Sequence, residues 1–219
     1  MDMGDLMGTR LFRGMDEKEI GACLAALDGR EGRYDKGEMI LRAGDDAREM
    51  GLMLSGRATV ENVDIWGNRT LLSPIAPGDC FAETYAMLGG MTLLVDVCAA
   101  TDCRVLLLRA AGLRGCGAAW ARKMTENLLG ISLHKNLALS TRSFHTAPKS
   151  LRGRVAAYLG TVAMQRGSRE FDIPFDRQEL ADYLSVDRSA LSKELSRMRD
   201  EGIVAFRKNH FCLLKGPEE

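Results

Sequence analysis

The side chains best suited to chemistry in this chain form one row near the C-terminus, where short hydroxyls alternate with cations. The row consists of Arg188, Ser189, Ser192, Lys193, Ser196 and Arg199, and it contains no acidic residue. In a helix these positions lie on one side. An arginine can bond both acceptors of a guanine, and a serine can bond several base edges. The row therefore predicts contact with DNA bases, although an ordinary solvated amphipathic helix gives the same pattern when this helix is taken alone.

Two helices joined by a tight turn must hold this row in place. Asp176 and Glu179 have the spacing of a capping box, which starts the first helix. The buried side of that helix is formed by Leu180, Ala181 and Leu184. Asp187 is a good N-cap for the second helix. The buried side of the second helix is formed by Leu191, Leu195 and Met198. Because only Ser185 and Val186 separate the two, the segment predicts a helix-turn-helix.

A short β-hairpin is expected after the second helix. Gly202 should end that helix at a left-handed position. The two expected strands are Ile203–Phe206 and Phe211–Leu214. Arg207 and Lys208 lie in the basic turn between them, which suits phosphate contact, and a solvated hairpin tip is the alternative. The whole segment predicts a winged helix-turn-helix that places its second helix in the major groove.

The segment RQELADYLSVDRSALSKELSRM closely resembles the DNA-binding motif of the CRP/FNR family of bacterial transcription regulators. The resemblance places Arg177 where a residue of the family touches phosphate. It places Arg188, Ser189 and Lys193 at the base-reading positions, and Ser192 where the family often has a small residue. It covers nearly the whole chain, and it implies double-stranded DNA and RNA polymerase as partners.

The N-terminal half has short apolar runs between turn residues. These runs are Glu38–Leu41, Gly51–Leu54, Ala58–Val63, Thr70–Ile75 and Arg104–Leu108. Their number and spacing predict an antiparallel sandwich or barrel. Asp16 and Glu19 repeat the capping-box spacing ahead of it. The family resemblance implies a jelly roll of the cyclic-nucleotide-binding type, whose turn glycines here are Gly37, Gly44, Gly56 and Gly78.

The effector pocket is where the chain departs from its relatives. By resemblance, cyclic-nucleotide binders use a Glu for the ribose hydroxyl, followed by an Arg and a small hydroxyl residue for the phosphate. Glu83 is present, but counting ten and eleven positions on gives Leu93 and Leu94, and no Arg lies between Glu83 and Arg104. A buried phosphate without a cation is costly. We therefore predict a small-molecule effector or a redox signal other than cyclic AMP or cyclic GMP, with Glu83 either in the pocket or structural.

A haem-based sensor of NO or CO is a second interpretation of the same pocket. Possible axial ligands are His134, Met124, Met91, Cys80 and Cys98, and core packing is the alternative for the methionines and cysteines. Glu83, Leu93, Leu94 and His134 are the candidate pocket residues. Cys98 and Cys103 are also candidates for a redox pair across a tight turn.

Other metal chemistry is disfavoured. Only Cys23 precedes residue 80, whereas the iron–sulfur branch of the family uses a cluster of N-terminal cysteines. The three histidines, His134, His145 and His210, lie outside the expected barrel, and a cupin-type enzyme needs several inside it. We therefore expect no metal site, no catalytic residue and no enzyme activity.

The segment Ala118–Ser140 predicts one long helix with two apolar stripes. The first stripe is Trp120, Met124, Leu128, Ile131 and Ala138. The second is Leu129, Leu133 and Leu137. One stripe can pack on the barrel and the other on the same helix of a second subunit, and burial within one domain is the alternative. A homodimer would place two recognition helices ~34 Å apart on a pseudo-palindromic operator.

The length of 219 residues allows two modest domains and a connector. Together with the residue patterns above, the family resemblance implies an α+β protein with an N-terminal antiparallel β jelly roll, a long dimerisation helix and a C-terminal winged helix-turn-helix. We expect domain boundaries at 1–116, 117–146 and 147–219. The net charge of zero makes any DNA contact local. The lack of an apolar run of ~18–20 residues or a signal sequence, and six scattered cysteines without a CxxC pair, indicate a cytoplasmic protein without membrane partners. A small-molecule-binding protein whose helical domain does not bind DNA remains the alternative function.

Overall fold

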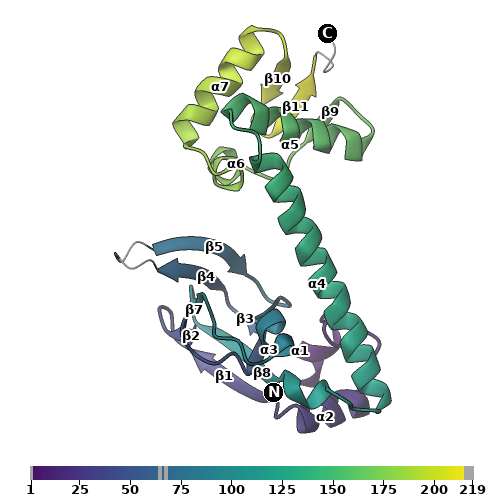
Figure 1. Ribbon diagram of the computed structural model, residues 1–219. Helices are drawn as coiled ribbons and strands as arrows, with labels where there is room; N and C mark the ends of the chain where they lie inside the picture. The colour runs from purple at the N-terminus through teal and green to yellow at the C-terminus, as the bar shows by residue number, and fades with distance from the viewer. Residues whose placement is uncertain (1, 64–65, 67–68, 215–219) are drawn as a thin grey trace. The chain divides into compact units, whose positions relative to one another are not determined.

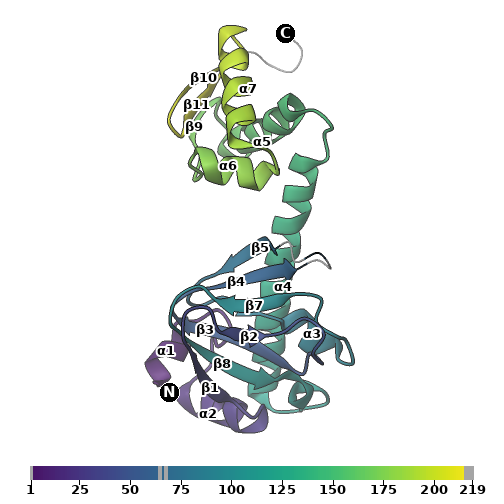
Figure 2. The same cartoon turned by 90° about the vertical axis from the view of Figure 1, so that its left-hand side faces the viewer.

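The computed structural model describes residues 2–63, 66 and 69–214 (Figures 1 and 2). The chain forms two compact units, Met1–His134 and Lys135–Glu219. We refer to them as the N-terminal unit and the C-terminal unit. The long helix α4 (Ala119–Thr146) contributes residues to both.

The N-terminal unit is built around two antiparallel sheets. Its strands are β1 (Arg30–Tyr34), β2 (Met39–Leu41), β3 (Glu49–Ser55), β4 (Ala58–Val63), β5 (Arg69–Ile75), β6 (Cys80–Phe81), β7 (Asp96–Ala99) and β8 (Cys103–Arg109). Their order is β1-β8-β3-β6 in one sheet and β2-β7-β4-β5 in the other. Its helices are α1 (Met3–Met7), α2 (Glu17–Ala26), α3 (Glu83–Leu88) and the 3₁₀ helix η1 (Ala110–Leu113), together with the start of α4. The predicted antiparallel sandwich is confirmed.

Strand β8 is buried on both faces, which explains its unbroken apolar run. Val105 and Leu107 pack between the two sheets. Leu106 and Leu108 pack on the other side, in a cluster that includes residues of α1, α2 and α4. A short run with no polar alternation is typical of such a strand. Figure 2 shows β8 between its neighbours β1 and β3 in the sheet.

The turn glycines and the first capping box are confirmed. Gly37, Gly44, Gly56 and Gly78 all have φ between +80° and +93°. At Gly56 a Cβ atom would also lie 2.2 Å from the carbonyl oxygen of Asp102, so that turn requires glycine for two reasons. Asp16 and Glu19 each bond the other's backbone N–H at the start of α2.

Helix α4 is longer than predicted. It continues to Thr146, so the expected end at Ser140 is wrong. Its last turn is completed by the Thr146 hydroxyl, which donates to the Arg142 carbonyl at 2.9 Å, and Pro148 follows only after the helix has ended. In the N-terminal unit the first stripe is buried at Trp120, Met124 and Leu128.

The C-terminal unit has the predicted order of elements and one additional strand. Its elements after α4 are α5 (Leu151–Arg166), β9 (Glu170–Asp172), α6 (Arg177–Leu184), α7 (Arg188–Asp200), β10 (Val204–Arg207) and β11 (His210–Leu213). The strands form an antiparallel sheet in the order β10-β11-β9. Leu180, Leu184, Leu191, Leu195 and Met198 are buried in one core with residues of α5, as their spacing predicted.

Candidate nucleic-acid interface

The start of α7 is fixed by its N-cap. Asp187 accepts from the Ala190 backbone N–H at 2.9 Å and from the Ser189 hydroxyl at 2.5 Å. The hydrogen bond from Ser189 and then that from Ala190 lower the pKa of the Asp187 carboxyl. The predicted cap is confirmed, and it holds the first turn of α7 in one conformation.

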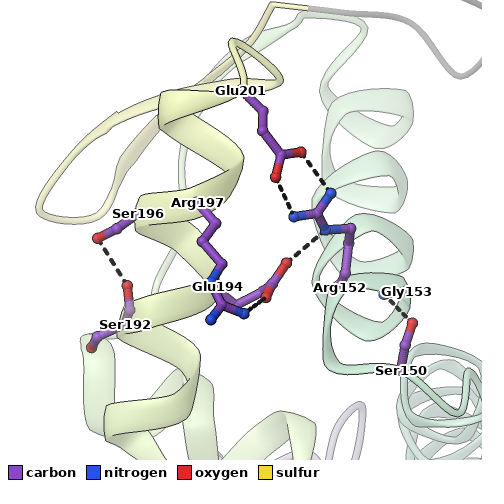
Figure 3. Close-up of polar contacts among 8 residues, drawn as sticks. All are labelled: Ser150, Arg152, Gly153, Ser192, Glu194, Ser196, Arg197 and Glu201. Carbon is purple, nitrogen blue, oxygen red and sulfur yellow. Dashed lines mark hydrogen bonds and ion pairs between the residues drawn. The ribbon is translucent and has the colours of Figure 1, made fainter.

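The predicted row lies on the side of α7 that is not buried. Arg188, Ser189, Lys193 and Arg199 are exposed, whereas Ser192 and Ser196 are half-buried. Figure 3 shows Ser192 and Ser196 on one side of α7, with α5 on the other. Both serines bond within the helix: Ser192 Oγ donates to the Arg188 carbonyl at 2.9 Å, and Ser196 Oγ donates to the Ser192 carbonyl at 3.0 Å. Because these protons are used within the helix, each serine offers its oxygen as an acceptor, which suits the amino groups of cytosine and adenine.

The turn between α6 and α7 is held by two arginines that the sequence analysis did not predict to have a role. Ser185 takes a left-handed conformation with φ 54°. Arg142, at the end of α4, and Arg154, in α5, donate to the four carbonyls of residues 182–185 at 2.9 to 3.1 Å. The last carbonyls of a helix have no partner within it, so these bonds satisfy the end of α6. No local pattern predicts them, since each joins residues far apart in the chain.

Arg177 contacts the wing hairpin. Its guanidinium lies 5.1 Å from the ring centroid of Phe206 and 5.8 Å from that of Phe211, and burial lowers its pKa. Arg177 and Lys208 both line a groove of ≈ 520 Å³ between the start of α6 and the wing turn. Lys208 is exposed with φ 56°, and Arg207 is exposed beside it. The structure thus brings Arg177 and Lys208, two of the three residues predicted to contact phosphate, to one groove, and it leaves the third, Arg207, exposed.

The four candidate effector residues do not come together in the same way. Glu83 is buried at the start of α3. Leu93 is buried too, and it lines a pocket of ≈ 320 Å³ whose lining includes neither Glu83 nor His134. Leu94 is 69% exposed, so it does not line an apolar pocket in this chain. His134 is exposed on α4, with Nδ1 2.7 Å from the Gly130 carbonyl.

The proposed haem and redox residues are mostly in the core. Met124, Cys80, Cys98 and Cys103 are buried among apolar side chains, and burial raises the pKa of the Cys103 thiol. The cysteines are free thiols. Within residues 2–63, 66 and 69–214, no group of three or more His, Cys, Asp and Glu side chains is placed to hold a metal ion. In the same residues, no helix is both long and apolar enough to cross a membrane.

An aromatic cluster forms the base of the helix-turn-helix. His145, at the end of α4, is 2% exposed, and its ring meets Tyr158 edge-on at 5.4 Å. His145 Nδ1 lies 2.9 Å from the Tyr183 hydroxyl. Its Nε2 atom is buried and has no hydrogen-bond partner in the described part of the chain. Burial lowers the pKa of His145, because a charged ring would leave an unpaired N–H in apolar surroundings.

The pKa values of His145 and His210 are shifted in opposite directions. His210 Nε2 and Nδ1 each lie 3.0 Å from a carboxylate, of Glu170 and Asp172 respectively, and these two partners raise its pKa. In a ¹H–¹³C NMR titration, we expect His145 to titrate below ~6.5 and His210 above it, where ~6.5 is the ordinary value. The replacements His145→Gln and His210→Gln would assign the two signals.

The same shifts set the pH dependence of stability. Below ~6.5 the unfolded chain binds a proton at residue 145 before the folded chain does, so the free energy of unfolding should fall as the pH decreases towards the folded pKa. The contribution of His210 is complete below ~6.5 and is lost as the pH rises through its folded pKa. A His145 signal that titrates above the ordinary value would contradict the buried neutral ring.

Known proteins match both units. Residues 31–118 match the family model of the cyclic nucleotide-binding domain, and residues 153–218 match that of the Crp-like helix-turn-helix domain. The chain is 24% identical over 181 residues to the transcriptional activator protein FnrL of Cereibacter sphaeroides, and the matched segment covers 78% of this chain and 71% of FnrL.

Solved structures share the fold. The catabolite activator protein of Thermus thermophilus is 23% identical with a TM-score of 0.51, covering 94% of this chain and 93% of that one. CprK complexed with OCPA is 15% identical with a TM-score of 0.65, covering 91% and 92%. A cyclic-nucleotide-binding-type β domain joined to a winged helix-turn-helix defines a DNA-binding transcription regulator. The chain belongs to the CRP/FNR family.

Proposed function

We propose that this regulator is a homodimer in which two copies of α7 read a pseudo-palindromic operator. The observation that carries the proposal is the exposed row on α7. Arg188, Ser189 and Lys193 are exposed there, while the opposite side of the helix is buried in the core. Arg and Ser at these positions can bond base edges in the major groove. Two such helices ~34 Å apart would read two half-sites, one helical turn from each other.

Phosphate contacts would fix the register of each half. Arg177 and Lys208 line the groove beside the wing, and Arg207, the residue before Lys208, is exposed, which supports the assignment of all three to the DNA backbone. Contacts of this kind supply affinity and orientation but carry little sequence information. In this proposal the bound dimer then contacts RNA polymerase, the partner that the family resemblance implies.

The dimer interface in this proposal is the second stripe of α4. Leu129, Leu133 and Leu137 recur every fourth residue and are 58%, 60% and 66% exposed. Three leucines in one exposed row are better explained by a partner surface than by solvent. A signal in the N-terminal unit would bias the arrangement of the two α4 helices, and hence the spacing of the two α7 helices.

The effector in this proposal is not a cyclic nucleotide. Leu93 is buried, Leu94 is exposed, and no Arg or Lys occurs between Glu83 and Arg104. Arg114, the next arginine after Arg109, donates to two carbonyls at the end of α3. CprK is complexed with OCPA, so this fold also accommodates other ligands. Cyclic AMP at 100 times its Kd would stabilise a binder by ~2.7 kcal/mol, and we expect no thermal shift at all.

Selection from a random duplex pool tests the DNA-reading proposal. The full-length protein should enrich an inverted repeat whose half-sites are one helical turn apart, and its affinity should fall linearly on a log–log plot against salt. A shuffled duplex of equal length is the control. A protein whose helix-turn-helix is only a scaffold would enrich no sequence and show no salt-dependent affinity.

A further inference from the structure

The side of α7 that faces α5 carries two carboxylates, and one arginine bonds both of them. Arg152 Nε donates to Glu194 Oε1 at 2.6 Å. Its Nη1 and Nη2 donate to the two oxygens of Glu201 at 2.6 and 2.8 Å. Figure 3 shows this guanidinium between the two glutamates, away from Ser192 and Ser196. All three nitrogens of the guanidinium are therefore used on α7 and the residue that follows it.

Arg152 lies where a cation is unfavourable for its own helix. It is in the first turn of α5, which contains no acidic residue, and the positive end of the helix dipole is at that turn. The start of α5 is fixed by Ser150, whose Oγ accepts from the Gly153 N–H at 3.0 Å (Figure 3). The local sequence thus gives Arg152 no partner, and its partners come from the recognition helix.

The geometry constrains rotation of α7 about its axis. Glu194 and Glu201 are two turns apart and lie on nearly the same side of the helix. The Glu194 side chain is only 12% exposed, and its second oxygen lies 3.6 Å from Arg197 Nη1. The apolar contacts of Leu191 and Leu195 bury α7 but are not directional. A planar guanidinium that bonds a carboxylate through two nitrogens, in contrast, fixes direction as well as distance.

We propose that Arg152 is a positioning residue that sets the rotation of α7, and therefore which base edges Arg188 and Lys193 meet. This inference rests on the proposed base-reading role of α7. A rotation of the helix moves every residue of the row together. Loss of the ion pairs of Arg152 with Glu194 and Glu201 should therefore reduce the discrimination between DNA sequences. It should not weaken attraction to the phosphate backbone, because Arg152 contributes no DNA contact in this proposal.

The replacement Arg152→Lys separates positioning from charge, since lysine keeps the charge but lacks the planar fork. We expect the ratio of affinities for the selected operator and a shuffled duplex to fall about tenfold, within the range of a single misplaced base contact. The salt slope should be unchanged. Arg166→Lys, an exposed position in the last turn of α5, is the matched control. Binding is measured well below the unfolding transition of each variant, so that loss of folding is excluded.

A double-mutant cycle tests whether the loss of sequence discrimination in Arg152→Lys results from the broken contact with Glu201. Glu201→Gln alone should also lower the ratio, and the double variant Arg152→Lys with Glu201→Gln should be little worse than Arg152→Lys. Fully additive losses, an unchanged ratio in Arg152→Lys, or a reduced salt slope would each overturn the positioning role. If the wild-type protein selects no operator, the DNA-reading proposal fails instead, so the two failures are distinguishable.

Discussion

Replacing Leu129 and Leu133 with aspartate should convert the protein to a monomer and weaken operator binding by a factor of ~10²–10⁴, the usual range for losing a second linked contact. Both leucines are more than half exposed on one side of α4. In a dimer they would be buried against the same helix of the partner. An aspartate there must lose its hydration or separate the helices, and an unpaired buried charge costs several kcal/mol.

The oligomeric state and the DNA affinity are measured on the same variant. Sedimentation equilibrium gives the first, and fluorescence anisotropy with full and half operators gives the second. Met164→Asp is the matched control, because Met164 is 82% exposed on α5 and undergoes the same change from apolar to acidic. If the α4 variant remains a dimer, the interface lies elsewhere. If it is a monomer that binds the full operator as tightly as the wild type, two-site reading is wrong.

The features that the sequence predicted well depend on neighbouring residues. Asp176 and Glu179 form the expected capping box, with bonds of 2.9 and 2.7 Å. Asp187 caps α7, and Gly202 has φ +70° after its end. A capping box or a left-handed turn is completed within a few residues, so its spacing is visible without a fold.

The features that could not be predicted from the sequence depend on residues far apart in the chain. Strand β1, REGRY, has no apolar alternation, and it pairs with β8 through a long-range register in which Glu31 bonds Arg104 at 2.8 Å. The end of α4 was placed too early because its last residues also contact α6, which is distant in the sequence: Arg142 donates to the carbonyl of Tyr183, 41 residues further along the chain. These pairings become apparent only when the chain is folded.

The candidate site shows the same division. The row on α7 follows from helical periodicity, and none of its six residues is buried: four are exposed, and Ser192 and Ser196 are half-buried. Arg152 could not be predicted from the local pattern, because its carboxylate partners lie more than forty residues away. Arg177 was expected at a phosphate, yet its guanidinium also stacks on two aromatic rings of the wing, a contact that depends on the hairpin's position.

Arg188→Ala should weaken binding to the selected operator by ~1–3 kcal/mol per base contact and relax specificity at one position of each half-site. Arg188 is exposed at the first position of α7, where the recognition helix of this motif enters the groove. Alanine retains the helix but removes the fork that bonds both acceptors of a guanine. The loss should therefore concentrate at the base pair that Arg188 meets.

Affinities for operators with each base pair substituted in turn would locate that position. The matched control is Arg166→Ala, which removes one positive charge from an exposed site in α5. A residue that contacts only phosphate gives a different result: binding weakens equally for all sequences, and the salt slope falls by about one. If Arg188→Ala behaves in that way, Arg188 positions the protein rather than reading a base. If it binds the operator as tightly as the wild type, neither role is correct, and sequence reading must rest on Ser189 and Lys193.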